Sequence, residues 1–329
     1  MNWPSVIAEI GINHDGDIYK AVRMIHDAHD AGCKCVKFQC HIPEAEMIPN
    51  NIIPSNANES IWDMMKRCAF TETQERALKK ETEKLGMQYL CTPFSMEAAE
   101  RLERMGVSMY KIGSGECNNY PLIKQIASYG KPIILSTGMN NYDSIDRAVD
   151  IIKLWGCPLA ILHCVSMYPT PYDMVNLGRM EELKRRYHVE VGLSDHSIGI
   201  YTSLAAVALG ASIIEKHFVS DRNWSGADVP ISLIPGELEE LVRGSKAVRE
   251  CVAAGIRSEV GENSTAEFAF ASVVSNRDVY PGDVLSRENI SVKRPGTGMI
   301  KAAQYEACLG REALTDIPKD TQLTWEMIS

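Results

Sequence analysis

The sequence lacks the features that mark membrane proteins, small secreted proteins and zinc-finger proteins. No apolar run reaches the roughly 20 residues that a membrane-spanning helix requires. The ten cysteines have no paired CxxC spacing of the zinc-binding type, and Cys35, Cys91 and Cys164 stand in apolar runs where a small buried thiol packs well. The chain also opens without the charged and apolar regions of a secretion signal. We therefore expect reduced cysteines and a cytoplasmic protein.

Basic character is also missing. The chain has 34 Lys and Arg against 43 Asp and Glu, a net charge of −9, and no long run of Lys and Arg. Because nucleic acids and anionic membranes bind basic surfaces, we expect neither as a partner. An anionic ligand would need a local basic pocket.

A regular alternation of short β-branched apolar runs and longer amphipathic stretches fills the chain up to about residue 255. Eight runs are expected to form strands, at 5–10, 35–39, 88–92, 109–112, 132–136, 159–164, 190–193 and 212–217. Eight βα units of this total length are typical of an α/β fold, the TIM (β/α)8 barrel. An open doubly wound sheet is the alternative, disfavoured because no GxGxxG follows the first run.

The composition changes after Gly255. Residues 256–266 have the polar character of a linker, and we expect them to join a barrel domain at 1–255 to a small, mostly β domain at 267–329. A domain of about 65 residues is near the lower limit for a self-sufficient core. Docking onto a barrel, its own or that of a partner, would stabilise it.

Polar residues crowd the carboxyl ends of the expected barrel strands, which is unusual because buried parallel strands are normally apolar. In such barrels the catalytic groups stand at these ends. Since an unpaired buried charge is costly, we expect these groups to converge on one face and to contact one another or a ligand. The group comprises Glu9, Asn13, His14, Lys37, Gln39, Thr92, Lys111, Ser114, Glu116, Ser136, Thr137, His163, Ser194, Asp195, His196, Glu215, Lys216 and His217.

Two lysines in this group indicate anion binding. Lys37 and Lys111 stand near Thr92 and the loop 113–115, a Gly-Ser-Gly sequence whose amides and hydroxyl can line a phosphate. Together they predict a small, doubly anionic substrate. The alternative is that the lysines only form salt bridges with Glu9 and Glu116.

Two histidines in the group indicate a metal ion. His196 and His217 end neighbouring strands about 4.8 Å apart, so both imidazoles can reach one ion. With carboxylates nearby they suit Mn²⁺ or a similar divalent cation acting as a Lewis acid on a carbonyl. His163 is a competing ligand, and beside Cys164 it leaves a zinc site open as an alternative.

Longer strings contain these residues in a fixed order: AEIGINHDG at 8–16, VKFQ at 36–39, CTPFS at 91–95, YKIGSGECNNYPLI at 110–123, KPIILSTGM at 131–139, LHCVSMYPTPYDMVNL at 162–177, GLSDHS at 192–197 and EKHF at 215–218. They resemble bacterial sialic acid (N-acetylneuraminate) synthases and their legionaminic and pseudaminic acid relatives. FAFASVV at 268–274 and VKRPGTGM at 292–299 resemble the antifreeze-like (SAF) domain at the carboxyl end of that family. The resemblance spans essentially the whole chain.

The resemblance implies a reaction and a set of roles. Phosphoenolpyruvate would condense with an open-chain N-acetylhexosamine, with a divalent metal, Mn²⁺ or else Mg²⁺ or Co²⁺. It implies His196 and His217 as metal ligands, phosphoenolpyruvate binding by Lys37, Thr92, Lys111 and Ser114, and placement of the sugar, the water and the proton by Glu9, Gln39, Glu116, Tyr168 and Asp228. Either Glu9 or Glu116 could take the proton of the attacking water.

The resemblance also implies an assembly and a substrate. Arg294 would reach from the SAF domain of one protomer into the barrel of its partner, in a domain-swapped homodimer. The CNNYPL and FAFASVV strings favour N-acetylmannosamine as the sugar, although many relatives carry a His where Val229 stands. The alternatives are a legionaminic or pseudaminic acid synthase acting on a diacetamido-trideoxyhexose, a metal-dependent aldolase or lyase, and a non-catalytic sugar-phosphate-binding protein.

Overall fold

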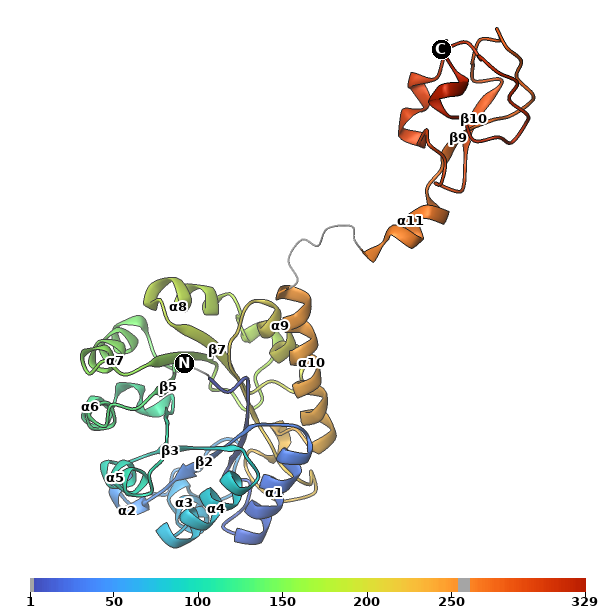
Figure 1. Cartoon of the computed structure of the whole chain (residues 1–329). Helices are drawn as coiled ribbons and strands as arrows, with labels where there is room; N and C mark the ends of the chain where they lie inside the picture. Colours follow the sequence, from blue (N-terminus) through green and yellow to red (C-terminus); the bar gives the residue numbers. More distant parts are fainter. Residues whose placement is uncertain (1–2, 254–260) are drawn as a thin grey trace. The chain divides into compact units, whose positions relative to one another are not determined.

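The computed structural model describes residues 3–253 and 261–329, and the chain divides into two compact units at residues 253 and 254. The first unit is built on eight parallel strands, in the hydrogen-bonded order β3-β2-β1-β8-β7-β6-β5-β4, with β3 and β4 also in contact. The expected TIM barrel is therefore confirmed (Figure 1). The strands are β1 (Val6–Gly11), β2 (Cys35–Cys40), β3 (Gln88–Pro93), β4 (Tyr110–Ile112), β5 (Ile133–Ser136), β6 (Leu159–Cys164), β7 (Glu190–Asp195) and β8 (Ile214–His217).

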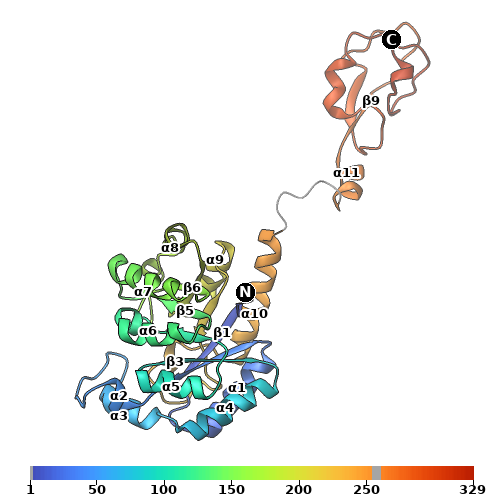
Figure 2. The same cartoon turned by 60° about the vertical axis from the view of Figure 1, so that its left-hand side comes forward.

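Helices surround these strands in both views of the barrel (Figures 1 and 2). Side-chain caps fix several helix starts: Asp17 caps the first long helix, and Thr71 forms a capping box with Gln74. No helix among residues 3–253 and 261–329 is long and apolar enough to cross a membrane. The helices of this unit are α1 (Ile18–Asp30), α2 (Pro43–Glu46), α3 (Ile61–Cys68), α4 (Glu72–Lys84), α5 (Met96–Arg104), α6 (Tyr120–Ser128), α7 (Tyr142–Leu154), α8 (Arg179–Tyr187), α9 (Tyr201–Ala208) and α10 (Pro235–Ala253).

The two-residue period of the strands separates two apolar cores. Side chains that point outward pack against the helices, whereas a smaller cluster fills the inside of the barrel. The inner cluster comprises Ile7, Cys35, Leu90, Met109, Ile134, Ala160, Leu162 and Ile213. Two residues further along most of these strands, at positions that point to the same side, the side chains are polar or charged. The barrel interior therefore has an apolar layer below and a polar layer at the carboxyl ends of the strands.

The second unit has its own apolar core, which includes Val273, Ile290 and Leu323. Its regular strands are β9 (Ser272–Ser275) and β10 (Ile290–Lys293), which pair antiparallel, and isolated bridges tie the remaining segments together. Helix α11 (Asn263–Ala269) begins inside the segment 256–266 that we expected to be a polar linker. Residues 256–260 of that segment lie outside the described residues.

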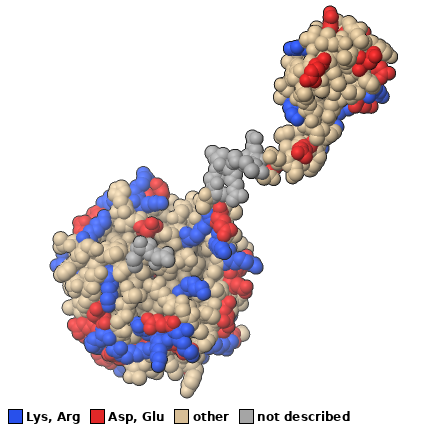
Figure 3. Space-filling model, viewed as in Figure 1, with Lys and Arg blue, Asp and Glu red and all other residues tan. Residues whose placement is uncertain are grey.

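Acidic and basic side chains are interspersed over the visible face of each unit, as Figure 3 shows. This mixture is ordinary for a surface in contact with water. The concentration of charge that bears on function lies inside the barrel, in the polar layer.

Candidate active site

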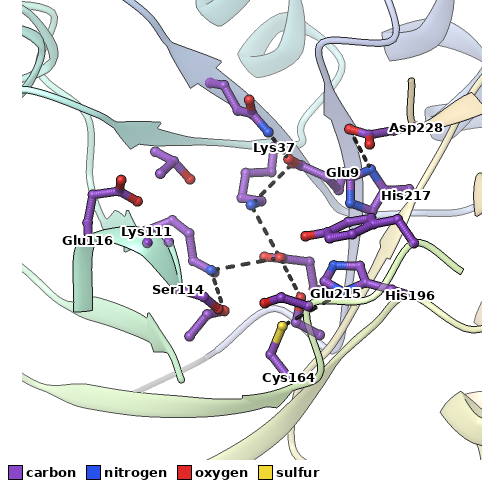
Figure 4. A pocket seen from close by; sticks show the side chains of 18 of the residues that line it. Glu9, Lys37, Lys111, Ser114, Glu116, Cys164, His196, Glu215, His217 and Asp228 are labelled. Carbon is purple, nitrogen blue, oxygen red and sulfur yellow. Dashed lines mark hydrogen bonds and ion pairs between the residues drawn. The ribbon is translucent and has the colours of Figure 1, made fainter. Parts of the chain in front are cut away.

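A cavity of about 320 Å³ opens at the carboxyl ends of the barrel strands (Figure 4). Its size falls at the lower end of the range for small-molecule sites. The structure brings into it every site residue that we predicted within the barrel: Glu9, Lys37, Gln39, Thr92, Lys111, Ser114, Glu116, Tyr168, His196, His217 and Asp228. Arg294 belongs to the second unit, where it is exposed just after β10. The roles that we assigned to these residues stay predictions.

A carboxylate without an assigned role lies at the centre of the charged groups. Lys37 Nζ lies 3.2 Å from Glu215 Oε1 and 3.3 Å from Glu9 Oε2, and Lys111 Nζ lies 3.8 Å from Glu215 Oε1. Burial alone would raise the pKa of Glu215, but Lys111 and Lys37 lower it to about 2. Burial alone would lower the pKa of Lys37, but Glu215 and Glu9 raise it above its usual value. Both partners of this pair are therefore charged.

The sequence offered a signal for Glu215 that we did not use to assign it a role. Glu215 stands two residues before His217 on β8, so both side chains point into the barrel. The alternative that the lysines only form salt bridges with Glu9 and Glu116 is correct in one part, because Lys37 pairs with Glu9. Among the described residues, however, no lysine forms an ion pair with Glu116.

Lys111 lies among groups that can bind an anion. Burial lowers the pKa of Lys111, and its ammonium donates a 2.6 Å hydrogen bond to Ser136 Oγ. Ser114 Oγ accepts a hydrogen bond of 3.0 Å from the amide of Gly138, which fixes the loop 113–115 against the end of β5. Thr92 Oγ1 is buried and has no hydrogen-bond partner among the described residues. A bound anion would supply that partner, since buried polar groups are normally satisfied.

The two candidate proton-transfer carboxylates stand in different surroundings. Glu9 Oε1 accepts a 2.9 Å hydrogen bond from Gln39 Nε2, and Glu9 Oε2 lies 3.3 Å from Lys37 Nζ, so this carboxylate is ion-paired. Burial raises the pKa of Glu9 and that of Glu116, the latter to about 7. Glu116 Oε2 has no hydrogen-bond partner among the described residues. Its carboxylate lies over Gly113, where an added Cβ would stand 2.6 Å from Oε2, so a larger residue there would displace this carboxylate.

Of the two candidates, Glu116 is therefore the one without an ion-pair partner among the described residues, which suits it to exchange a proton.

The two expected metal ligands lie side by side in the cavity, with ring centroids 5.4 Å apart. His196 Nδ1 donates to the carbonyl of Val165 at 2.8 Å, so Nε2 is the nitrogen that carries the lone pair in the neutral ring. Burial alone would lower the pKa of His196, but the neighbouring Cys164 raises it above its usual value. Burial lowers the pKa of His217 to about 4, which keeps that ring neutral. Within the part of the chain that the structure describes, His217 Nδ1 is buried without a hydrogen-bond partner, 3.6 Å from Asp228 Oδ2. Such nitrogens fit a divalent ion, because neutral imidazole is the ligating form.

The rest of a coordination sphere would come from water or substrate. In the part of the chain that the structure describes, no three His, Cys, Asp or Glu side chains form a cluster that could hold an ion. His163, which we considered as a competing ligand, donates from Nε2 to the carbonyl of Val175 at 2.7 Å and does not line the cavity. The donors present therefore fit an open site with few protein ligands.

The expectation that all strand-end charges converge on one face is wrong for one buried pair. Asp195 and Lys216 alternate with the cavity residues His196 and His217, so they point outward, and their charged atoms lie 3.2 Å apart. Asp195 also accepts hydrogen bonds of 2.6 Å from the hydroxyls of Thr202 and Ser203. This network ties the ends of β7 and β8 together directly behind the two histidines.

Two further strand-end residues are structural. Asn13 donates to the carbonyl of Phe218 at 2.9 Å and to Ser232 Oγ at 2.8 Å, and these bonds hold the loop after β8 in place. The ring of His14 is buried and stacks on Phe70 at 4.2 Å. Neither side chain lines the cavity.

Comparisons with known proteins agree with this geometry. A model of the NeuB family matches residues 24–257, and a model of the SAF domain matches residues 270–329. The chain is 37% identical over 330 residues to an N,N'-diacetyllegionaminic acid synthase of Campylobacter jejuni, covering 97% of this chain and 98% of that one. It is 30% identical to human N-acetylneuraminate-9-phosphate synthase over 98% of this chain and 92% of that one. A solved structure of an N-acetylneuraminic acid synthetase from Leptospira borgpetersenii, bound to citrate, aligns with a TM-score of 0.74 at 36% identity, over 81% of this chain and 91% of that one.

Proposed function

The chain belongs to the NeuB family, and from this premise we propose that it condenses phosphoenolpyruvate with N-acetylmannosamine to give N-acetylneuraminate and phosphate. It is an enzyme of the sialic, legionaminic or pseudaminic acid synthase type. The observation that carries the proposal is one cavity in which two lysines, two imidazole rings and a carboxylate without an ion-pair partner among the described residues face one another. We further propose that the enzyme works as a cytoplasmic homodimer.

Different residues of the cavity would act on phosphoenolpyruvate, on the attacking water and on the sugar. Lys37 and Lys111 hold the carboxylate and phosphate of phosphoenolpyruvate, with Thr92 and Ser114 as neutral partners. C3 of phosphoenolpyruvate forms a bond to the aldehyde carbon of the open-chain sugar, and water then adds at C2 before phosphate leaves. Glu116 orients that water and takes its proton, because among the described residues neither lysine of the cavity forms an ion pair with it, unlike Glu9 and Glu215. A divalent ion bound by His196 and His217 would polarise the aldehyde oxygen.

We propose that residues around Asp228 help to select the sugar. Val229 is buried directly after Asp228, so the chain places an apolar group beside this cavity residue. The similarity to the Leptospira enzyme supports N-acetylmannosamine. The similarity to the Campylobacter enzyme supports a diacetamido-trideoxyhexose as the second candidate.

One assay separates these candidates. The purified protein is incubated with phosphoenolpyruvate, Mn²⁺ and either N-acetylmannosamine or the diacetamido sugar, and both released phosphate and product mass are measured. We expect phosphate and a nine-carbon acid with N-acetylmannosamine. A product formed only from the diacetamido sugar would establish the second candidate instead. A condensation or cleavage without phosphate release would identify an aldolase or lyase and overturn the proposal.

The two lysines are expected to act on one substrate rather than on both. Lys37→Met or Lys111→Met should raise the KM for phosphoenolpyruvate by about tenfold or more, because a hydrogen bond to a charged group contributes about 1.5 to 3 kcal/mol. The KM for the sugar should change little. Initial-rate measurements with each substrate varied in turn test this, and equal effects on both substrates would make the lysines structural. Lys80→Met, on the outside of the barrel in α4, is the control.

Arg294 is expected to act on the active site of a partner protomer. Its planar guanidinium suits the amide carbonyl of an N-acyl sugar, which neither the metal nor the lysines would bind. We therefore expect inactive Arg294→Ala chains and inactive His217→Ala chains to regain activity when their subunits exchange. Mixed dimers would then hold one site with both residues intact. If mixing restores no activity although exchange is complete, Arg294 does not act across protomers.

A further inference from the structure

A line of hydrogen bonds runs from the cavity into the barrel wall behind Gln39. Glu9 Oε1 accepts from Gln39 Nε2 at 2.9 Å, and Gln39 Oε1 lies 2.9 Å from His41 Nε2. His41 Nδ1 in turn lies 3.0 Å from each carboxylate oxygen of Glu46. Glu9 and Gln39 line the cavity, whereas His41 and Glu46 do not.

The two outer members of this line are buried and held in place. The side chains of His41 and Glu46 are 4% and 3% exposed, so water does not compete for their hydrogen bonds. The His41 ring stacks on Phe94 at 4.4 Å with an interplanar angle of 18°, and Phe94 lines the cavity. Glu46 ends α2, the short helix that follows β2.

The direction of the inner hydrogen bonds follows from the atoms that meet. Glu9 is ion-paired with Lys37, and Gln39 turns its NH₂ group toward the Glu9 carboxylate. The amide oxygen of Gln39 therefore faces His41 Nε2, which must donate because an amide oxygen only accepts. On the other side of the ring, both carboxylate oxygens of Glu46 lie 3.0 Å from His41 Nδ1 and hold the ring in this orientation.

This direction decides what Gln39 offers to a substrate. Its NH₂ group has two N–H bonds, and only one is directed to Glu9. A ring without a proton on Nε2 would accept there and would favour the reversed amide, which places the amide oxygen against the Glu9 carboxylate. Gly11 leaves room for the bond between Glu9 and Gln39, since an added Cβ there would lie 3.0 Å from Glu9 Oε1 and 3.2 Å from Gln39 Nε2.

We propose that His41 and Glu46 form a positioning pair, which locks the amide of Gln39 with its NH₂ group toward Glu9 and the cavity and so makes Gln39 a hydrogen-bond donor to the sugar. This inference rests on the proposed function, in which Gln39 contacts the N-acyl hexosamine. His41 and Glu46 act through Gln39 and touch no substrate themselves.

The first arm of the test measures the protonation of His41 directly and needs no substrate. Two-bond ¹H–¹⁵N correlation spectra of the histidine-labelled full chain, near neutral pH, distinguish a doubly protonated ring from a singly protonated one. His41→Phe, which keeps the stacking on Phe94, assigns the signal by its disappearance. The same spectra show which nitrogen of a singly protonated ring carries the proton. We expect a protonated Nε2 in the wild type and loss of this fixed state in Glu46→Gln, which removes the charge and keeps the volume. An Nε2 without a proton in the wild type overturns the proposal.

The second arm measures the effect on catalysis. Glu46→Gln should raise the KM for the sugar by about tenfold and leave the KM for phosphoenolpyruvate within about twofold, because the lysines are untouched. Glu81→Gln is the matched control, since Glu81 pairs with His26 at 3.0 Å on the outside of the barrel. Equal changes in both KM values would indicate general structural damage and contradict the proposal. If no sugar yields a product, the proposed function fails, and the spectra still decide the state of His41.

Discussion

Glu116→Gln is expected to lower kcat by a factor of about 10² to 10⁴, the usual contribution of a positioned general base. Glutamine keeps the shape of the side chain over Gly113 but cannot take a proton from the water that adds at C2. Substrate binding depends on the lysines, so both KM values should stay near those of the wild type. Steady-state rates with each substrate varied measure the effect, and Glu97→Gln, on the exposed face of α5, is the control.

The pH dependence of the wild type tests the same assignment. Burial raises the pKa of Glu116 to about 7, so the carboxyl is protonated below that pH and ionised above it. Because a base acts in its ionised form, kcat should fall as the pH is lowered through about 7. Glu116→Gln should abolish this decrease of kcat at low pH. If Glu9→Gln abolishes it and Glu116→Gln does not, Glu9 is the base.

Loss of either cavity histidine is expected to remove nearly all activity from a folded protein. Because the described residues offer the ion two neighbouring imidazoles and no three-ligand cluster, His196→Ala or His217→Ala leaves too few fixed ligands, and affinity for Mn²⁺ should fall by at least about 100-fold. Calorimetric titration of the chelator-treated protein with Mn²⁺ measures this without substrate. Circular dichroism verifies the fold of each variant.

His163→Gln is the control for these variants. Its ring faces Val175 outside the cavity, so the variant should bind Mn²⁺ as the wild type does. The metal assignment would be wrong if this variant lost the ion and His217→Ala retained it. Chelator treatment alone should also stop turnover by the wild type, with Mn²⁺ restoring it best.

The barrel and most of its site could be predicted because both follow from local sequence patterns. Each strand is a short apolar run with a polar residue near its carboxyl end, and the fold collects those ends at one face. Which strand-end side chains face the inside of the barrel was harder to predict, although the two-residue period determines it. His196 and His217 point inward, whereas Asp195 and Lys216 point outward. His41 and Glu46 gave no such signal, because they follow the strand and meet through a loop whose path depends on tertiary packing.

The apolar layer inside the barrel closes the inner end of the cavity. Leu90, Met109 and Ile213 lie in the cluster that fills the barrel beneath the polar layer, so substrates and products share the mouth above it. Lys111 and Lys37 are 1% and 4% exposed, whereas Tyr168 is 39% exposed. With the roles proposed above, the anion would bind deep in the cavity and the sugar nearer its mouth. We expect compulsory order in the kinetics: phosphoenolpyruvate binds first, and the bound sugar then blocks its exit from the cavity.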